Sequence, residues 1–127
     1  MRIVRSAEQI LRDAKTIAVV GASPDPARPS NGVMRYLQRA GYHVLPVNPL
    51  CEEYWPSLAA LEEPVDLVDV FRRPEFCADV AHEAAAIGAP ALWLQLGIRS
   101  PEAQRIAEEA GMDYVENACT AVVHRYI

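Results

Sequence analysis

The sequence is short of several features, and each shortage excludes a class of protein. Its three histidines have no metal-ligand spacing, and its three cysteines contain no CxxC pair, so neither a zinc site nor a disulfide framework is indicated. Apolar runs such as Thr16 to Val20 are far shorter than the roughly 20 residues that span a bilayer, and no signal-peptide segment is recognisable. We therefore expect a cytoplasmic protein that binds no metal and does not enter a membrane.

Lysine is also nearly absent. Lys15 is the only lysine among 12 basic side chains, and 17 acidic side chains give a formal net charge of −5. Nucleic acids and anionic membranes require a basic face, so neither is an expected partner. Arginine suits bidentate recognition of phosphate or carboxylate, which leaves room for a local cationic pocket, although a compositional bias of the genome also explains the arginines.

The sequence does contain enough apolar residues for one core. Its 127 residues are 51% hydrophobic and 23% charged. This length and composition predict a single domain over residues 1–127 and exclude disorder and low-complexity fibres.

A repeated order of helix, glycine and strand organises this domain. Three predicted helices each end at a glycine that precedes an apolar strand, and a capping box at Ser6 and Gln9 opens a further helix that runs to Ala14. The three helices are Asn31 to Ala40, Pro74 to Ile87 and Pro101 to Ala110, and the five strands cover residues 16–20, 42–47, 65–70, 91–96 and 112–115. Strands that alternate with crossover helices predict an α/β fold: a five-stranded parallel sheet with helices on both faces.

In such open sheets, ligands bind beyond the carboxyl ends of the strands. This rule selects five segments: Gly21 to Ser30, Asn48-Pro49, Phe71-Arg72-Arg73, Gln95-Leu96-Gly97 and Asn117 to Thr120.

The loop from Gly21 to Ser30 has the features of a phosphate site. Gly21 permits close backbone approach, Ser23 and Ser30 offer hydroxyl groups, Arg28 adds a cation, and the following helix presents free N–H groups. The three prolines of the loop also fit a stiff surface loop that binds nothing.

The nicotinamide dinucleotide fingerprint fails twice. Ser23 and Pro26 stand where it requires glycines, and Asn48 stands where it requires an acidic residue. Asn48-Pro49 is compatible with a ligand contact or with a simple turn. Alternation along an extended chain predicts that only one of Arg72 and Arg73 faces the ligand, with the other solvated or paired with Glu75.

No catalytic grouping is recognisable. The chain has no nucleophile elbow, Walker loop or HExxH motif, and Asp66 and Asp69 fall within a predicted strand. Cys119 is the one nucleophile near the expected ligand edge, although a free cysteine is more often a small buried apolar residue. We predict no catalytic residue and no metal ligand.

Taken in order, several segments resemble the small coenzyme A-binding family of Rossmann-like proteins, which is related to the first domain of the succinyl-coenzyme A synthetase alpha chain. The resemblance covers almost the whole chain and is carried by residues 17–23, 28–30, 46–49, 54–58, 65–73 and 93–97. The chain departs from the family pattern at the shortened loop 50–55 and at Asn117-Ala118-Cys119-Thr120, where the family often has Asp-Arg-Cys-Pro.

The resemblance implies a Rossmann-like three-layer sandwich with coenzyme A bound over the strand ends. It implies that the loop from Gly21 to Ser30 surrounds the phosphates of coenzyme A. It also implies that Asn48, Pro49 and residues 70–73 contact the nucleotide, and that residues 95–97 line the route to the pantetheine. The candidate cofactor-binding residues are Gly21, Ala22, Ser23, Arg28, Pro29, Ser30, Asn48, Pro49, Val70, Phe71, Arg72, Arg73, Gln95, Leu96, Gly97 and Cys119.

Three functions are compatible with these residues. The first is a protein that binds coenzyme A or an acyl-coenzyme A without catalysis of its own, as a carrier, sensor or regulatory module. The second is a small NAD(P)-dependent oxidoreductase, or another nucleotide-using enzyme subunit, that is completed by a partner. The third is a redox role in which Cys119 forms a mixed disulfide with coenzyme A.

Overall fold

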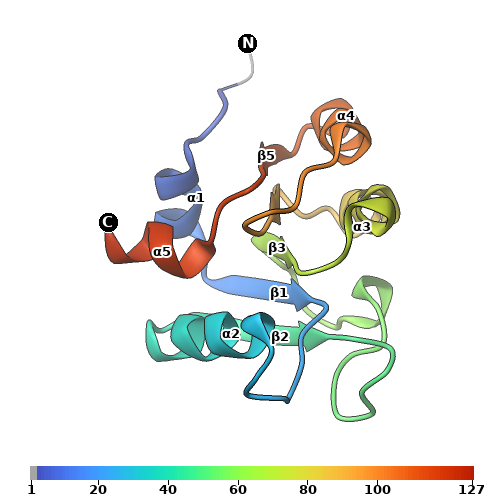
Figure 1. The fold of residues 1–127 in the computed structure, drawn as a ribbon. Helices are drawn as coiled ribbons and strands as arrows, with labels where there is room; N and C mark the ends of the chain where they lie inside the picture. Colours follow the sequence, from blue (N-terminus) through green and yellow to red (C-terminus); the bar gives the residue numbers. More distant parts are fainter. Residues whose placement is uncertain (1–2) are drawn as a thin grey trace.

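The computed structural model describes residues 3–127, which contain one five-stranded sheet with every neighbouring pair of strands parallel. The strand order is β2-β1-β3-β4-β5 (Figure 1). The strands are β1 (Thr16–Val20), β2 (His43–Val47), β3 (Leu67–Val70), β4 (Ala91–Leu94) and β5 (Asp113–Val115).

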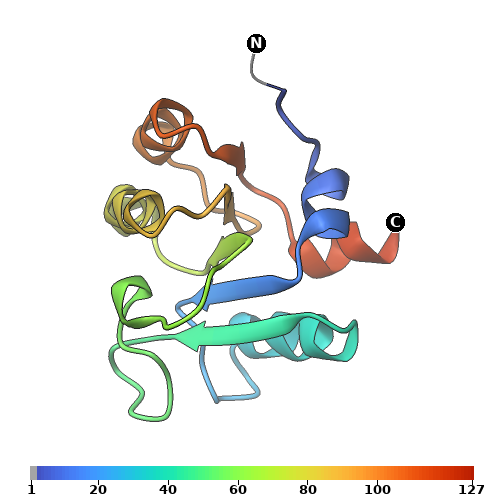
Figure 2. The ribbon, with the colours of Figure 1, turned by 180° about the vertical axis from the view of Figure 1, so that it is seen from behind.

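Helices cover both faces of this sheet, which confirms the predicted α/β architecture. One face carries α1 (Ala7–Asp13), α2 (Pro29–Arg39) and α5 (Thr120–Arg125) (Figures 1 and 2). The other carries the short 3-10 helix η1 (Leu58–Ala60), α3 (Pro74–Ala86) and α4 (Pro101–Glu109). No helix in residues 3–127 combines the length and apolar character needed to cross a bilayer.

Because both faces are covered, the strands are apolar on both sides and supply two cores. Leu67 and Trp93 pack with α1 and α2 on one face, whereas Val68 and Val70 pack with α3 and α4 on the other. This double coverage explains why the strands appear in the sequence as continuous apolar runs instead of alternating patterns.

Some element boundaries differ from the prediction, and two differences matter for the site. Helix α2 begins at Pro29, two residues earlier than predicted, because proline is well tolerated at the first helical position. Strand β4 ends at Leu94, so Gln95 and Leu96 leave the sheet, although the sequence placed both inside a strand. Both differences move polar or exposed side chains to the carboxyl edge.

The strand order places β1 at the point where the chain changes direction across the sheet. From β1 the chain passes to β2 on one side and then returns to β3 on the other side of β1. The carboxyl ends of β1 and β3 therefore flank the crevice in which ligands of such sheets bind.

Gly21 is required at this crevice. It has a φ of +86°, and a Cβ atom built on it would lie 2.5 Å from the carbonyl oxygen of Phe71. The loops that follow β1 and β3 therefore touch backbone to backbone, which a larger residue would prevent.

We predict that Gly21→Ala destabilises the protein by about 1–3 kcal/mol, because the substitution combines a left-handed backbone with a steric clash. The matched control is Gly32→Ala within α2, where a Cβ meets no atom within 4 Å. This change should increase stability by roughly 0.5–1 kcal/mol. Urea unfolding of both variants measures the two effects, and an unchanged midpoint for Gly21→Ala would contradict the close approach.

Candidate functional site

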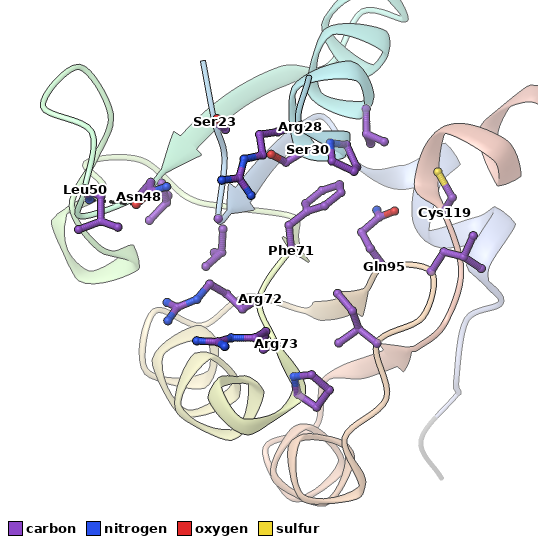
Figure 3. A pocket seen from close by; sticks show the side chains of 18 of the residues that line it. Ser23, Arg28, Ser30, Asn48, Leu50, Phe71, Arg72, Arg73, Gln95 and Cys119 are labelled. Atoms are coloured by element: carbon purple, nitrogen blue, oxygen red, sulfur yellow. Dashed lines mark hydrogen bonds between the residues drawn. The ribbon is translucent and has the colours of Figure 1, made fainter. Parts of the chain in front are cut away.

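A cavity of about 1000 Å³ opens at the carboxyl ends of the strands (Figure 3). This volume lies at the upper end of the range of about 300–1,000 Å³ that is usual for ligand pockets. The lining residues are Val20, Gly21, Ser23, Arg28, Pro29, Ser30, Val33, Val47, Asn48, Pro49, Leu50, Phe71, Arg72, Arg73, Pro74, Gln95, Leu96, Ile98 and Cys119.

Most of the candidate residues line this cavity, and the exceptions are Ala22, Val70 and Gly97. Ala22 and Val70 are fully buried, one in each of the two cores. Gly97 instead donates its backbone N–H to Asn117 Oδ1 at 2.7 Å and so shapes the loop after β4.

The lining residues that the sequence did not indicate are all apolar: Val20, Val33, Val47, Leu50, Pro74 and Ile98. Apolar residues that line a cavity cannot be separated from core residues by sequence pattern. One signal was present for Val33, which follows Ser30 by three positions and so shares its face of the helix.

The loop between β1 and α2 is held by its own side chains. Asn31 donates from Nδ2 to the carbonyl of Ser23 at 2.9 Å, and Ser23 Oγ accepts from the backbone of Asp25 at 3.1 Å. Asp25 in turn accepts from the backbone of Ala27 at 2.9 Å. The loop is therefore an ordered turn at the rim of the cavity.

The beginning of α2 can receive an anion. No side chain caps this eleven-residue helix, so some of its first N–H groups have no partner within the helix. Ser30 lines the cavity, is 4% exposed and makes no side-chain hydrogen bond within residues 3–127. An accessible hydroxyl group beside free N–H groups is an arrangement that suits a phosphate.

The side chain of Asn48 has a structural task. Its Nδ2 donates to the carbonyl of Ala22 at 2.9 Å, and its Oδ1 accepts from the backbone of Leu50 at 2.9 Å. The structure therefore supports the turn interpretation of Asn48-Pro49, because both ends of the amide are already engaged. Asn48 joins the end of β2 to the loop after β1.

Both Arg72 and Arg73 line the cavity, and Arg73 also lies near Glu75, the partner that the sequence suggested for one of the two. The chain leaves β3 at Val70, and the alternation of an extended strand no longer applies beyond it. The guanidinium carbons of Arg72 and Arg73 lie 4.5 and 5.4 Å from the centroid of the Phe76 ring. Phe76 is thus a support for two cations.

Few carboxylates compete for these cations. Arg73 lies 3.8 Å from Glu75, but both side chains are more than 60% exposed, and such pairs contribute little. Arg28 and Arg72 form no ion pair within the described part of the chain. Figure 3 shows Arg28 across the cavity from Arg72 and Arg73, with Gln95 and Cys119 at the opposite end.

The segment before α5 positions Cys119 at that opposite end. The buried indole of Trp93 donates to the carbonyl of Ala118 at 2.8 Å, and the backbone of Asn117 donates to that of Ile98 at 3.1 Å. Asn117 adopts a left-handed conformation with φ 54°, which asparagine tolerates well. These bonds fix the half-buried Cys119 beside the cavity.

A buried polar cluster lies directly behind this end. Gln95 Nε2 donates to Asp69 Oδ1 at 2.6 Å and to Thr120 Oγ1 at 2.8 Å, and Thr120 donates to Asp69 Oδ2 at 3.0 Å. Burial raises the pKa of Asp69 to about 7, although the hydrogen bonds from Gln95 and Thr120 act to lower it. The sequence placed Asp69 in a strand and did not reveal this role, although an aspartate within a buried apolar strand was a signal.

We predict that Asp69 makes the stability of the protein depend on pH. A carboxyl whose pKa is about 7 in the folded protein and about 3.8 otherwise binds more protons in the folded state between those values. Stability therefore falls as the pH rises from about 4 to about 7. Relative to the isosteric Asp69→Asn variant, the wild type should lose up to about 1.4 kcal/mol per pH unit in this window.

Urea unfolding of both proteins across this pH range measures the difference. If the free energies of unfolding of the two proteins had the same dependence on pH, the raised pKa of Asp69 would be contradicted.

Within residues 3–127, no three histidine, cysteine, aspartate or glutamate side chains gather closely enough to hold a metal ion. The polar side chains that line the cavity are three arginines, two serines, two amides and one cysteine.

Comparison with known proteins places this chain in a family. Uncharacterized protein YneT of Bacillus subtilis is 38% identical over 122 residues, which cover 92% of this chain and 90% of that protein. A solved Thermus thermophilus structure is 43% identical, with a TM-score of 0.88. The match covers 96% of this chain and 98% of the Thermus chain. A solved Pyrococcus horikoshii structure is 36% identical, with a TM-score of 0.91. The match covers 99% of this chain and 98% of the Pyrococcus chain. A family model described as a CoA binding domain matches residues 15–125, so the chain belongs to the CoA-binding domain family.

Proposed function

We propose that the cavity binds coenzyme A or an acyl-coenzyme A, and that the protein acts as a non-catalytic carrier, sensor or regulatory module. The observation that carries this proposal is the division of one cavity into two chemically different ends, in a chain of the CoA-binding domain family.

The cationic end matches the nucleotide of coenzyme A. The diphosphate and the ribose monophosphate together carry about four negative charges near neutral pH. Arg28, Arg72 and Arg73 supply guanidinium groups around the cavity, and the beginning of α2 supplies free N–H groups. Although the protein is acidic overall, its cavity thus contains the cations that a polyanionic ligand requires.

The opposite end matches the pantetheine arm. This arm is uncharged and largely apolar, with amide groups and a terminal thiol. Gln95 and Cys119 are the polar groups at this end. The cavity lining also includes the apolar residues Leu96, Ile98 and Val33. We therefore orient the ligand with its phosphates at the arginines and its thiol toward Cys119.

The composition of the cavity lining supports a binding role without catalysis. The lining residues include no histidine, aspartate or glutamate, which are the usual general acids and bases. The oxidoreductase alternative gains no support, because the amide of Asn48 is engaged by backbone groups at the position where a nicotinamide dinucleotide requires a carboxylate.

We predict that coenzyme A raises the melting temperature by mass action, because it binds the folded state. Arg28→Ala and Arg72→Ala should each weaken binding about 10-fold or more, since a charge-assisted hydrogen bond contributes roughly 1.5–3 kcal/mol. Arg105→Ala is the matched control, because Arg105 is exposed on α4 and pairs with Glu102 and Glu109 of the same helix.

Isothermal titration calorimetry at one fixed ionic strength measures these affinities. An absence of heat and of any thermal shift with saturating coenzyme A would overturn the proposal. Tight NADPH binding with hydride transfer would favour the oxidoreductase instead, and equal losses in all three variants would contradict the assigned cationic end.

The position of Cys119 supports a second candidate, a mixed disulfide with coenzyme A. Cys119 lines the cavity, whereas Cys51 does not, and Cys77 is fully buried with its pKa raised to about 11 by that burial. In this reaction the Cys119 thiolate attacks coenzyme A disulfide, forms a protein–coenzyme A disulfide and releases one coenzyme A thiolate.

Incubation with coenzyme A disulfide should therefore add one coenzyme A to the protein at Cys119. Mass spectrometry of the intact protein and its peptides measures this adduct, and Cys119→Ser is expected to abolish it. An adduct confined to Cys51 or Cys77 would reject this candidate.

A further inference from the structure

Gln95 has one polar atom that no group in residues 3–127 satisfies. Its side chain is 3% exposed, and its Nε2 donates to both Asp69 and Thr120. Its Oε1 accepts no hydrogen bond from residues 3–127, yet no side-chain oxygen or nitrogen in this part of the chain is enclosed without a partner. Because Gln95 lines the cavity, we infer that Oε1 is the atom that remains accessible there.

Asp69 and Thr120 fix the orientation of the Gln95 amide. Thr120 gives its hydroxyl hydrogen to Asp69 Oδ2, so it presents a lone pair to Gln95. Asp69 Oδ1 accepts a hydrogen bond from the same nitrogen. A flipped amide would place Oε1 against both acceptors, whereas the observed orientation makes two hydrogen bonds.

At the end of the cavity near Gln95, the group offered to a ligand is therefore a hydrogen-bond acceptor, Gln95 Oε1. A phosphate or carbonyl oxygen gains nothing from an acceptor, but an N–H or O–H group does. A ligand that covered Oε1 without donating to it would leave this amide oxygen unpaired, which costs about 1–3 kcal/mol.

We propose that Gln95 recognises the pantetheine arm by accepting a hydrogen bond from one of its N–H or O–H groups, and that Asp69 and Thr120 are the positioning residues that turn the Gln95 oxygen toward the ligand. This inference rests on the proposed binding of coenzyme A. It adds a specificity determinant at the end of the cavity away from the arginines. The acceptor favours the uncharged arm over the phosphates and so sets the direction in which the ligand lies.

Two probes separate the arm from the nucleotide. Coenzyme A contains both, whereas adenosine 3′,5′-bisphosphate lacks the arm. Gln95→Leu should lower the affinity for coenzyme A about 3–10-fold, the value of one neutral hydrogen bond, and leave the affinity for the bisphosphate unchanged. The bisphosphate also reports whether each variant keeps a folded nucleotide end.

The positioning residues are tested with the same two probes. Asp69→Leu removes the acceptor behind Gln95, so it should reproduce the selective loss of coenzyme A affinity. Asp69→Asn can still accept from Gln95 through its own oxygen, and should recover most of that loss. The double variant Gln95→Leu with Asp69→Leu should lose no more coenzyme A affinity than Gln95→Leu alone, because both changes act through one hydrogen bond.

The outcomes separate this inference from the proposed function. If neither probe binds the wild type, the proposed function fails. If both probes bind but Gln95→Leu weakens them equally, or weakens neither, the role of Gln95 is overturned. If Asp69→Leu does not fold, Thr120→Val replaces it. A smaller selective loss of coenzyme A affinity of about 2–3-fold then supports positioning, and an unchanged ratio of the two affinities overturns it.

Discussion

Parallel pairing of β1 with both β2 and β3 is the constraint on which the rest of the structure depends. Because all five strands point the same way, every chain segment that follows a strand emerges at one edge of the sheet. Residues as far apart in sequence as Gly21, Phe71 and Cys119 meet there. The backbones of Gly21 and Phe71, which both line the cavity, approach each other at the place where the strand order changes direction.

Charge and polarity follow from this arrangement. The protein is acidic overall, yet Arg28, Arg72 and Arg73 extend from the edge where few carboxylates lie. At the other end, Asp69 is buried without an ion pair in the described residues and is stabilised by Gln95 and Thr120 instead. A fully buried carboxyl group is costly unless hydrogen bonds surround it, and such positions are often functional.

The fold could be predicted from the sequence because the helix, glycine and strand pattern repeats, and because crossover helices imply parallel strands. The carboxyl-edge rule then located the polar part of the cavity lining, including Ser30 and Gln95. Arg73 was harder to place, since alternation predicts side-chain direction only while the chain remains in a strand. Val33 and Ile98 could not be predicted, because an apolar side chain beside a cavity looks in the sequence like one in the core. The Asp69, Gln95 and Thr120 cluster depends on three distant segments meeting, which no local pattern records.

The loop between β1 and α2 has a consequence for the entropy of association. Ser23, Asp25 and Asn31 tie this loop together through bonds internal to the protein. Ordering a loop around a ligand reduces affinity, because the conformational freedom of the loop is lost upon binding. Here that freedom is already restricted before any ligand arrives. The rim of the cavity is thus preorganised, and more of the interaction energy is retained as affinity.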